Sequence, residues 1–164
     1  MRVLILTEDT YGPKFLKGII TRLKNNNKVP QGTTVVYTKM PADCNSKMER
    51  ILTVRARSVD RIVILVDSDR WGSTEKAHKR AASHIPESLK KRTIIIPLRN
   101  CIEDWVCTGL KCGSNVKEPV KLLKKRFQKG YEKHQLPDFA NMLDLDVLEA
   151  KEDSFRKFLS SLMG

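Results

Sequence analysis

Short, almost uninterrupted apolar runs alternate with stretches of helical periodicity up to about residue 108. The runs are VLIL (3–6), TTVVYT (33–38), IVILV (62–66) and TIIIP (93–97). Runs without a polar face are typical of strands buried in a parallel sheet between two helical layers. Because the crossovers between such strands are right-handed, the alternation predicts an α/β fold with a doubly wound, mainly parallel sheet.

Two of the intervening segments show helical spacing, and a third has a helix start signal. Residues 15–23 place Phe15, Leu16, Ile19, Ile20 and Leu23 on one face, and residues 48–58 carry Met48, Ile51 and Leu52 at the same spacing. Ser73 or Thr74 can cap a helix through TEKAHKRAASH, with Glu75 in its first turn. These segments are the predicted crossover helices.

A helical extension follows the strands. The basic stretch NVKEPVKLLKKRFQKG (115–130) has an apolar stripe of Val116, Val120, Leu123 and Phe127. In the tail, Phe155, Phe158, Leu159 and Leu162 form a second stripe, which we expect Ser154 to cap and the core to bury. A partner-binding helix is the alternative for that tail. We predict one domain over residues 1–164, with a core of about 1–108 and an extension of about 114–164.

The chain is strongly basic, with 31 Lys and Arg against 19 Asp and Glu and a net charge of +12. Such a surplus favours a polyanionic partner such as DNA or RNA, although lysine-rich helix faces that only keep a protein soluble remain the alternative. No apolar run approaches the ~20 residues of a membrane span. MRVLILTEDTYG lacks the cleavage site of a signal peptide, so we expect a cytoplasmic protein without a membrane partner.

The cysteines show no metal-site or disulfide pattern. Cys44, Cys101, Cys107 and Cys112 contain no CxxC pair, and His78, His84 and His134 have no zinc-ligand spacing. We expect buried thiols. A disulfide between Cys107 and Cys112 is an open alternative without support from the pattern.

Acidic residues follow the predicted strands. Glu8 and Asp9 come after the first, Asp67 and Asp69 after the third, and Glu103 and Asp104 just past the fourth. Ligands of open parallel sheets bind beyond the carboxyl ends of the strands. If the first and third strands are neighbours, these acids converge and repel one another unless something neutralises them.

A divalent cation is the neutralising species that the pattern favours. Carboxylate oxygens suit Mg²⁺ or Mn²⁺, and a bound ion bridges carboxylates to phosphate, which a basic surface attracts. That combination predicts phosphodiester cleavage or transfer. Acids that only cap helices or pair with Lys and Arg are the alternative, and Glu8 by itself fits either interpretation.

The positions of Glu8 and of DSDRWG (67–72) resemble the TOPRIM family of topoisomerases, primases and small nucleases, which has a Glu after strand one and DxD after strand three. CIEDWV (101–106) and DSFRKFLSSL are similar to a stand-alone branch often encoded beside ATPases in defence loci. Where the family has a glycine directly after the Glu, this chain has Asp9, with Gly12 further on. The resemblance covers residues 1–108 well and the tail loosely.

The resemblance implies a TOPRIM/Rossmann-like fold and a metal-dependent nuclease, and it leaves open an ATPase partner. It makes Glu8 a general acid/base or metal ligand, and it makes Asp67 and Asp69 ligands of Mg²⁺. Glu103 becomes a further ligand or orients water. Arg70 contacts a phosphate or forms a salt bridge. No nucleophilic tyrosine domain is attached, which argues against topoisomerase action.

Two basic clusters are the candidate nucleic-acid surface. The first spans residues 76–92 and the second spans 117–133. The residues that we expect to contact nucleic acid are Arg70, Lys76, Lys79, Arg80, Lys121, Lys124 and Lys125. Contacts of lysine with phosphate position a strand without reading its sequence, so binding should be salt-sensitive. Trp71 and Trp105 are expected to pack in or beside the core.

Other functions compete with the nuclease. A phosphatase of the haloacid-dehalogenase type also uses DxD, but it places this motif after strand one and has Thr where Trp71 stands. A glycosyltransferase DxD needs a longer chain. A receiver domain would use Glu8 and Asp9, but its lysine cannot be placed. A non-catalytic subunit that binds nucleic acid or docks a partner is the remaining alternative.

Overall fold

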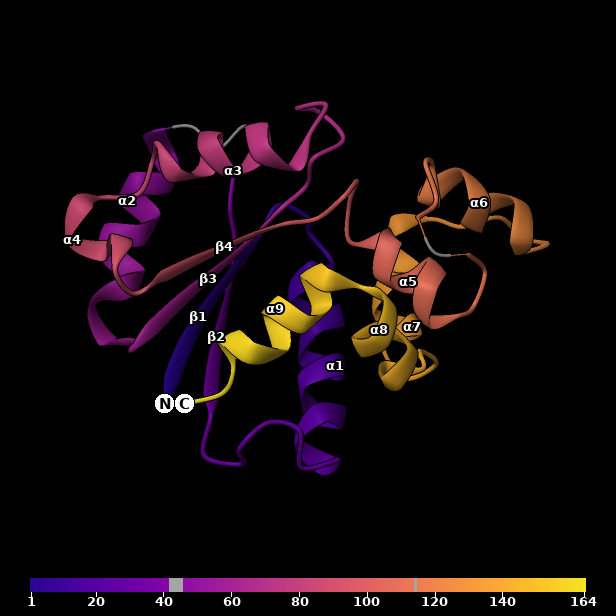
Figure 1. The fold of residues 1–164 in the computed structure, drawn as a ribbon, viewed down its shortest axis with the longest axis horizontal. Helices are drawn as coiled ribbons and strands as arrows, with labels where there is room; N and C mark the ends of the chain where they lie inside the picture. Colours follow the sequence, from indigo (N-terminus) through magenta and orange to yellow (C-terminus); the bar gives the residue numbers. More distant parts are fainter. Residues whose placement is uncertain (42–45, 114) are drawn as a thin grey trace.

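Four parallel strands form one sheet in the order β2-β1-β3-β4 in the computed structural model, which describes residues 1–41, 46–113 and 115–164 (Figure 1). The strands are β1 (Arg2–Thr7), β2 (Thr34–Lys39), β3 (Arg61–Val66) and β4 (Thr93–Pro97). β1 pairs directly with β3, which places Thr7 beside Leu65. The predicted parallel sheet, with its first and third strands adjacent, is therefore confirmed.

Helices cover both faces of the sheet (Figure 1). One hydrophobic cluster joins the sheet to α1 (Gly12–Asn25), α5 (Glu103–Gly109), α6 (Pro119–Arg126), α7 (Leu136–Phe139), α8 (Leu145–Lys151) and α9 (Asp153–Ser161). The other cluster holds α2 (Ser46–Arg55), the 3₁₀ turn Ala56–Ser58, α3 (Thr74–Ala82) and α4 (Glu87–Lys90). The fold is doubly wound, as the alternation predicts.

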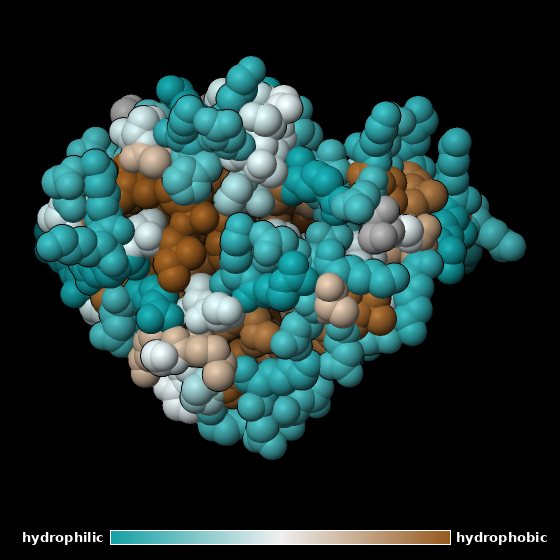
Figure 2. All heavy atoms as spheres, viewed as in Figure 1, coloured by the Kyte–Doolittle hydropathy of each residue, from teal (hydrophilic) through white to brown (hydrophobic). Residues whose placement is uncertain are grey.

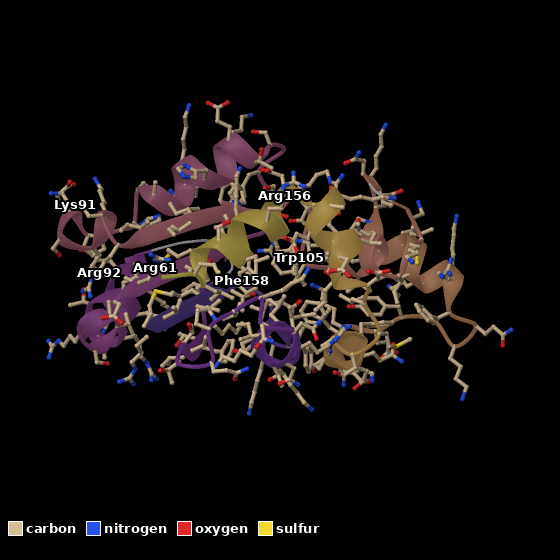
Figure 3. The ribbon with its side chains drawn as sticks, turned by 60° about the horizontal axis from the view of Figure 1, so that its bottom comes forward. Arg61, Lys91, Arg92, Trp105, Arg156 and Phe158 are labelled. Atoms are coloured by element: carbon tan, nitrogen blue, oxygen red, sulfur yellow. The ribbon has the colours of Figure 1, made fainter. Side chains whose placement is uncertain are left out.

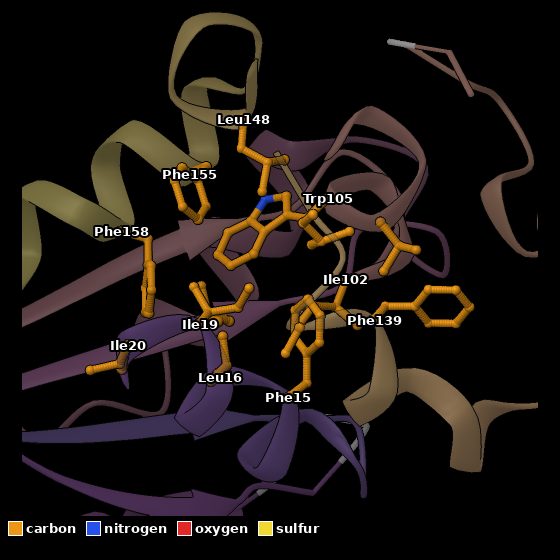
Figure 4. Close-up of a cluster of buried hydrophobic side chains, with 14 of the residues drawn as sticks. Phe15, Leu16, Ile19, Ile20, Ile102, Trp105, Phe139, Leu148, Phe155 and Phe158 are labelled. Atoms are coloured by element: carbon orange, nitrogen blue, oxygen red, sulfur yellow. The ribbon is translucent and has the colours of Figure 1, made fainter. Parts of the chain in front are cut away.

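The C-terminal helix is part of the core. Trp105 of α5 is fully buried, with its ring 5.1 Å from that of Phe155, edge to face, and 5.3 Å from that of Phe158 (Figure 4). The predicted cap at Ser154 is wrong, because Glu152 precedes the helix and Ser154 lies inside it. The Ser154 hydroxyl instead accepts a hydrogen bond of 2.9 Å from the indole Nε1 of Trp105.

The basic helix is shorter than the sequence indicates. α6 begins at Pro119 and ends at Arg126, because Phe127 has an extended backbone. Val116 and Phe127 therefore lie outside the helix, although both still pack against the core. Phe127 does so through the ring of Phe139, at 5.3 Å.

Three cysteines are free thiols, so Cys107 and Cys112 are not bridged. Cys101 and Cys107 are buried as expected, whereas Cys112 is partly exposed. Cys44 lies outside the described residues. Among the helices of the described ranges, none combines the length and the apolar character needed to span a bilayer.

The amino-terminal edge of the sheet carries its own basic residues. Arg61 begins β3 and donates hydrogen bonds to the carbonyl oxygens of Ser161 and Met163, at 2.8 and 2.6 Å. Figure 3 shows Arg61, Lys91 and Arg92 toward one end of the molecule, with Trp105 further along it. Lys91 and Arg92 directly precede β4, so the end of the first predicted basic cluster lies at the edge opposite the acids.

Candidate active site

Acids from three loops lie at the carboxyl edge of the sheet. Glu8 follows β1, Asp67 follows β3, and Glu103 begins α5 after the loop that leaves β4. Figure 1 shows these chain segments at the end of the sheet where α5 and α6 lie. The direct pairing of β1 with β3 brings the first two acids together, as predicted.

Glu8 and Asp67 are in contact. The backbone N–H of Asp67 donates a hydrogen bond of 3.3 Å to Oε1 of Glu8, whose residue is only 8% exposed. Burial, the largest cause, and the charges of Glu8, Asp69 and Glu103 together raise the pKa of Asp67 to about 8. Four predicted site residues therefore share one electrostatic environment.

Glu103 is fully buried and is held by residues from the C-terminal part of the chain. Its Oε1 accepts a hydrogen bond of 2.9 Å from the Tyr131 hydroxyl and lies 3.6 Å from Nζ of Lys133. Its other oxygen, Oε2, is buried without a hydrogen-bond partner in the part of the chain that the structure describes. Burial and the charge of Glu103 raise the pKa of Tyr131, so this phenol remains a donor.

Lys133 supplies a positive charge to the site, although about half of its side chain is exposed. Its Nζ lies 2.9 Å from Oδ2 of Asp9 as well as near Glu103. Burial opposes its charge, but Glu103 and Asp9 together hold the pKa of Lys133 above the ordinary value. The same ammonium lowers the pKa of Asp67 and so offsets part of the repulsion there.

Asp9 shapes the first loop. Its Oδ1 accepts hydrogen bonds from the backbone N–H groups of Tyr11, at 2.7 Å, and Gly12, at 3.2 Å. A side chain at Gly12 would meet Thr7, whose Oγ1 lies 2.7 Å from the position of an added Cβ. Asp9 thus forms an Asx-type turn into α1 and offers its other oxygen to Lys133.

The DSDRWG loop is a tight turn anchored to the neighbouring loop. The N–H groups of Ser68 and Asp69 donate to the carbonyl oxygen of Asn100, at 2.8 and 3.2 Å. The Ser68 carbonyl accepts from the N–H groups of Trp71 and Gly72, and Gly72 has a φ of 74°. Asp67 is partly buried by this turn, whereas Asp69 is exposed.

Asp104 belongs to the scaffold rather than to the acid cluster. Its carboxylate accepts hydrogen bonds from the backbone N–H and side-chain amide of Asn100, at 2.7 and 2.8 Å, and from the N–H of Cys101. These bonds shape the loop between β4 and α5. Asp104 is therefore what keeps the Asn100 carbonyl in place for the DSDRWG turn.

The donor set fits Mg²⁺ or Mn²⁺ in its chemistry. Glu8, Asp67 and Asp69 supply carboxylate oxygens, the ligands that these cations prefer. Within the described ranges, however, no three His, Cys, Asp or Glu side chains stand ready to hold a metal ion. Chelation by Glu8, Asp67 and Asp69 requires side-chain rotation, which the exposed Asp69 has room for.

The predicted basic residues lie in two separate places. Lys76, Lys79 and Arg80 are exposed on α3, where Lys79 pairs with Glu75 at 2.7 Å and the Arg80 guanidinium lies 5.8 Å from the ring centre of Trp71. Arg70 is exposed in the turn itself. The other group, Lys121, Lys124 and Lys125, is exposed on α6. Trp71 is partly buried against the core cluster of α2 and α3, as expected.

The sequence places Lys133 in the second basic cluster (117–133), but it predicts neither the contact of Lys133 with the acids nor any role for Tyr131. These two residues reach the acids from 124 and 28 positions away in the chain, respectively, and no local pattern predicts such contacts. Asp9 could have been recognised as the first residue of an Asx turn before Gly12.

The chain matches no protein-family model, and no curated protein or solved structure matches it either.

Proposed function

We propose that this protein is a Mg²⁺- or Mn²⁺-dependent phosphodiesterase that cleaves nucleic acid, in the manner of a small TOPRIM nuclease. The observation that supports this is the gathering of Glu8, Asp67, Asp69 and Glu103 at the carboxyl edge, where burial and mutual repulsion bring the pKa of Asp67 to about 8. A fold gains no stability by crowding acids in this way. Strongly perturbed carboxylates at the ligand-binding edge of a sheet are typical of functional sites.

The position of each residue in the site indicates the role that we propose for it. Asp67, Asp69 and Glu8 would hold the cation, which would polarise the phosphoryl group and lower the pKa of a water molecule. Glu103, fixed by Tyr131 and Lys133, orients that water through Oε2, the oxygen without a protein partner among the described residues. The lysines of α6 bind the phosphates on either side of the bond.

The test is cleavage of DNA and RNA, single- and double-stranded, in Mg²⁺, in Mn²⁺ and in chelator. Asp67→Asn should abolish cleavage while the protein still binds nucleic acid. Asp60→Asn is the matched control, because Asp60 directly precedes β3 whereas Asp67 directly follows it. Cleavage that persists in chelator, or in Asp67→Asn, contradicts the proposal.

One observation favours a non-catalytic binding subunit as the second candidate. Lys133 already balances Asp9 and Glu103 from within the chain, as a purely structural ion-pair network would. This alternative predicts that no cation induces cleavage in any substrate. It also predicts that Glu8→Gln leaves every measured property except stability unchanged.

A further inference from the structure

The surface around α6 contains two hollows that meet at that helix. The first has a volume of about 370 Å³ and lies between Asp69 and Asn100 on one side and Lys117, Lys121 and Lys124 on the other. The second, of about 540 Å³, lies between Lys124 and Lys133. Because both are lined by Val120 and Lys124, they lie next to each other along α6, and we call the two together the α6 groove.

Both ends of the α6 groove border the acidic site. The first hollow reaches Asp69 of the DSDRWG turn. The second reaches Lys133, whose Nζ contacts Asp9 and lies 3.6 Å from Glu103. A chain lying in the groove therefore passes the carboxylates that the proposed function assigns to catalysis.

Three lysines of the groove are available to a ligand. Lys121 pairs with Glu118, and Lys133 pairs with the buried acids. Lys117, Lys124 and Lys129 have neither an ion pair nor a hydrogen bond from their side chains within residues 1–41, 46–113 and 115–164, and all three are exposed. Exposed ammonium groups in a row along a groove suit the phosphates of a polyanion.

The groove also has an apolar floor. Pro119 and Val120 of α6 and Cys101 line the first hollow. Figure 2 shows the same end of the molecule with hydrophilic side chains around a smaller hydrophobic area. Apolar floors suit the faces of nucleobases, which a duplex keeps stacked and only a single strand exposes.

Building on the proposed function, we propose that the α6 groove binds single-stranded nucleic acid and delivers it to the acidic edge. Lys117, Lys124 and Lys129 contact successive phosphates, and bases lie on the partly exposed Val120. Duplex, whose base faces are covered, lies across the rim and binds more weakly. The α3 residues Lys79 and Arg80 lie outside the groove and contribute little.

The test measures binding separately from cleavage. The Asp67→Asn protein in chelator is titrated into fluorescent single-stranded DNA, single-stranded RNA and a duplex of the same sequence, at several salt concentrations. Lys124→Glu and Lys117→Glu are compared with Lys91→Glu, which makes the same charge change on the exposed Lys91 at the opposite edge of the sheet (Figure 3). Lys117 precedes α6, so its replacement leaves that helix intact if Lys124→Glu misfolds.

We expect single strands to bind more tightly than duplex. Each groove variant should weaken single-strand binding about tenfold and reduce the salt slope by about 1, while Lys91→Glu has the smaller effect of general charge. Groove variants that bind like Lys91→Glu, or duplex that binds as tightly as single strands, overturn the proposal and leave the metal-dependent cleavage test unaffected. Groove-dependent single-strand binding by a protein that cleaves nothing supports the groove and contradicts the proposed hydrolysis.

Discussion

At the scale of single residues, Lys133 is the cation whose charge offsets the charges of the acids in the site. Its ammonium contacts Asp9 and lies near Glu103, and it is the group that holds down the pKa of Asp67. About half of the side chain remains exposed to solvent, so water screens part of each interaction. Asp9 and Glu103 are almost fully buried, so water does not screen their charges to the same extent.

Lys133→Met is expected to destabilise the metal-free protein at neutral pH by about 1–2 kcal/mol, a value discounted for the exposure of the lysine. Urea unfolding measures this. Lys129→Met, an exposed neighbour, should change the free energy of unfolding by less than about 0.5 kcal/mol. Mg²⁺ should raise the free energy of unfolding of Lys133→Met more than that of the wild type. Equal effects on both proteins would contradict the role of Lys133 as the cation that offsets the acids.

Asp67 predicts a pH dependence of stability in chelator. The folded protein keeps the Asp67 proton up to a pKa of about 8, whereas the ordinary value is 3.8. Between these values the native state binds more protons than the unfolded state, so the stability from this group is complete below pH 4 and is lost as the pH rises through 8. From pH 5 to pH 9, the urea midpoint of the wild type should therefore fall relative to that of Asp67→Asn. Parallel curves would contradict a raised pKa.

At the scale of elements, the sequence predicts strands better than helix ends. Each end of β1 to β4 lies within one residue of the predicted run, because continuous apolar residues mark both limits of these strands. α6 was predicted too long, because its stripe continues through Val116 and Phe127, which pack against the core without helical backbone. The sequence predicts Ser154 as a helix cap, but its hydroxyl accepts a hydrogen bond from Trp105, which is distant in the chain.

Ser154→Ala tests that tertiary contact. The substitution leaves the buried Nε1–H of Trp105 without its acceptor, and we expect a loss of about 1–2 kcal/mol in the free energy of unfolding. Ser160→Ala, at an exposed position of the same α9, is the matched control and should be near neutral. A loss shared equally by both variants would indicate an effect of helix propensity instead.

At the scale of the whole molecule, the site is assembled from residues spread along the chain between Glu8 and Lys133. The acids could be predicted because each follows a strand and the strands share an edge. The groups that hold them could not, because Lys133 and Tyr131 come from the segment between α6 and α7, and only the tertiary fold brings this segment next to β1 and α5. The predicted cation and nucleic acid remain predictions for experiment.

A divalent cation should stabilise the whole fold. Mg²⁺ or Mn²⁺ at about a hundred times its dissociation constant is expected to add about 2.7 kcal/mol by mass action, seen as a rise in Tm. Glu8→Gln and Asp67→Asn should lose this rise, while Asp60→Asn keeps it. The cation affinity should also increase with pH up to about 8, because the proton on Asp67 must leave first. A Tm that responds to cations equally in all four proteins would argue for nonspecific surface binding.

Asp9 and Lys133 are separated by 124 positions, which has a consequence for synthesis. A nascent chain emerges from the ribosome with β1 and β3 first, and both acidic loops leave the tunnel well before the lysine that balances them. Until Lys133 has emerged, those loops repel each other without its opposing charge. A segment made after all four strands of the sheet thus completes the electrostatic balance of the first acidic loop.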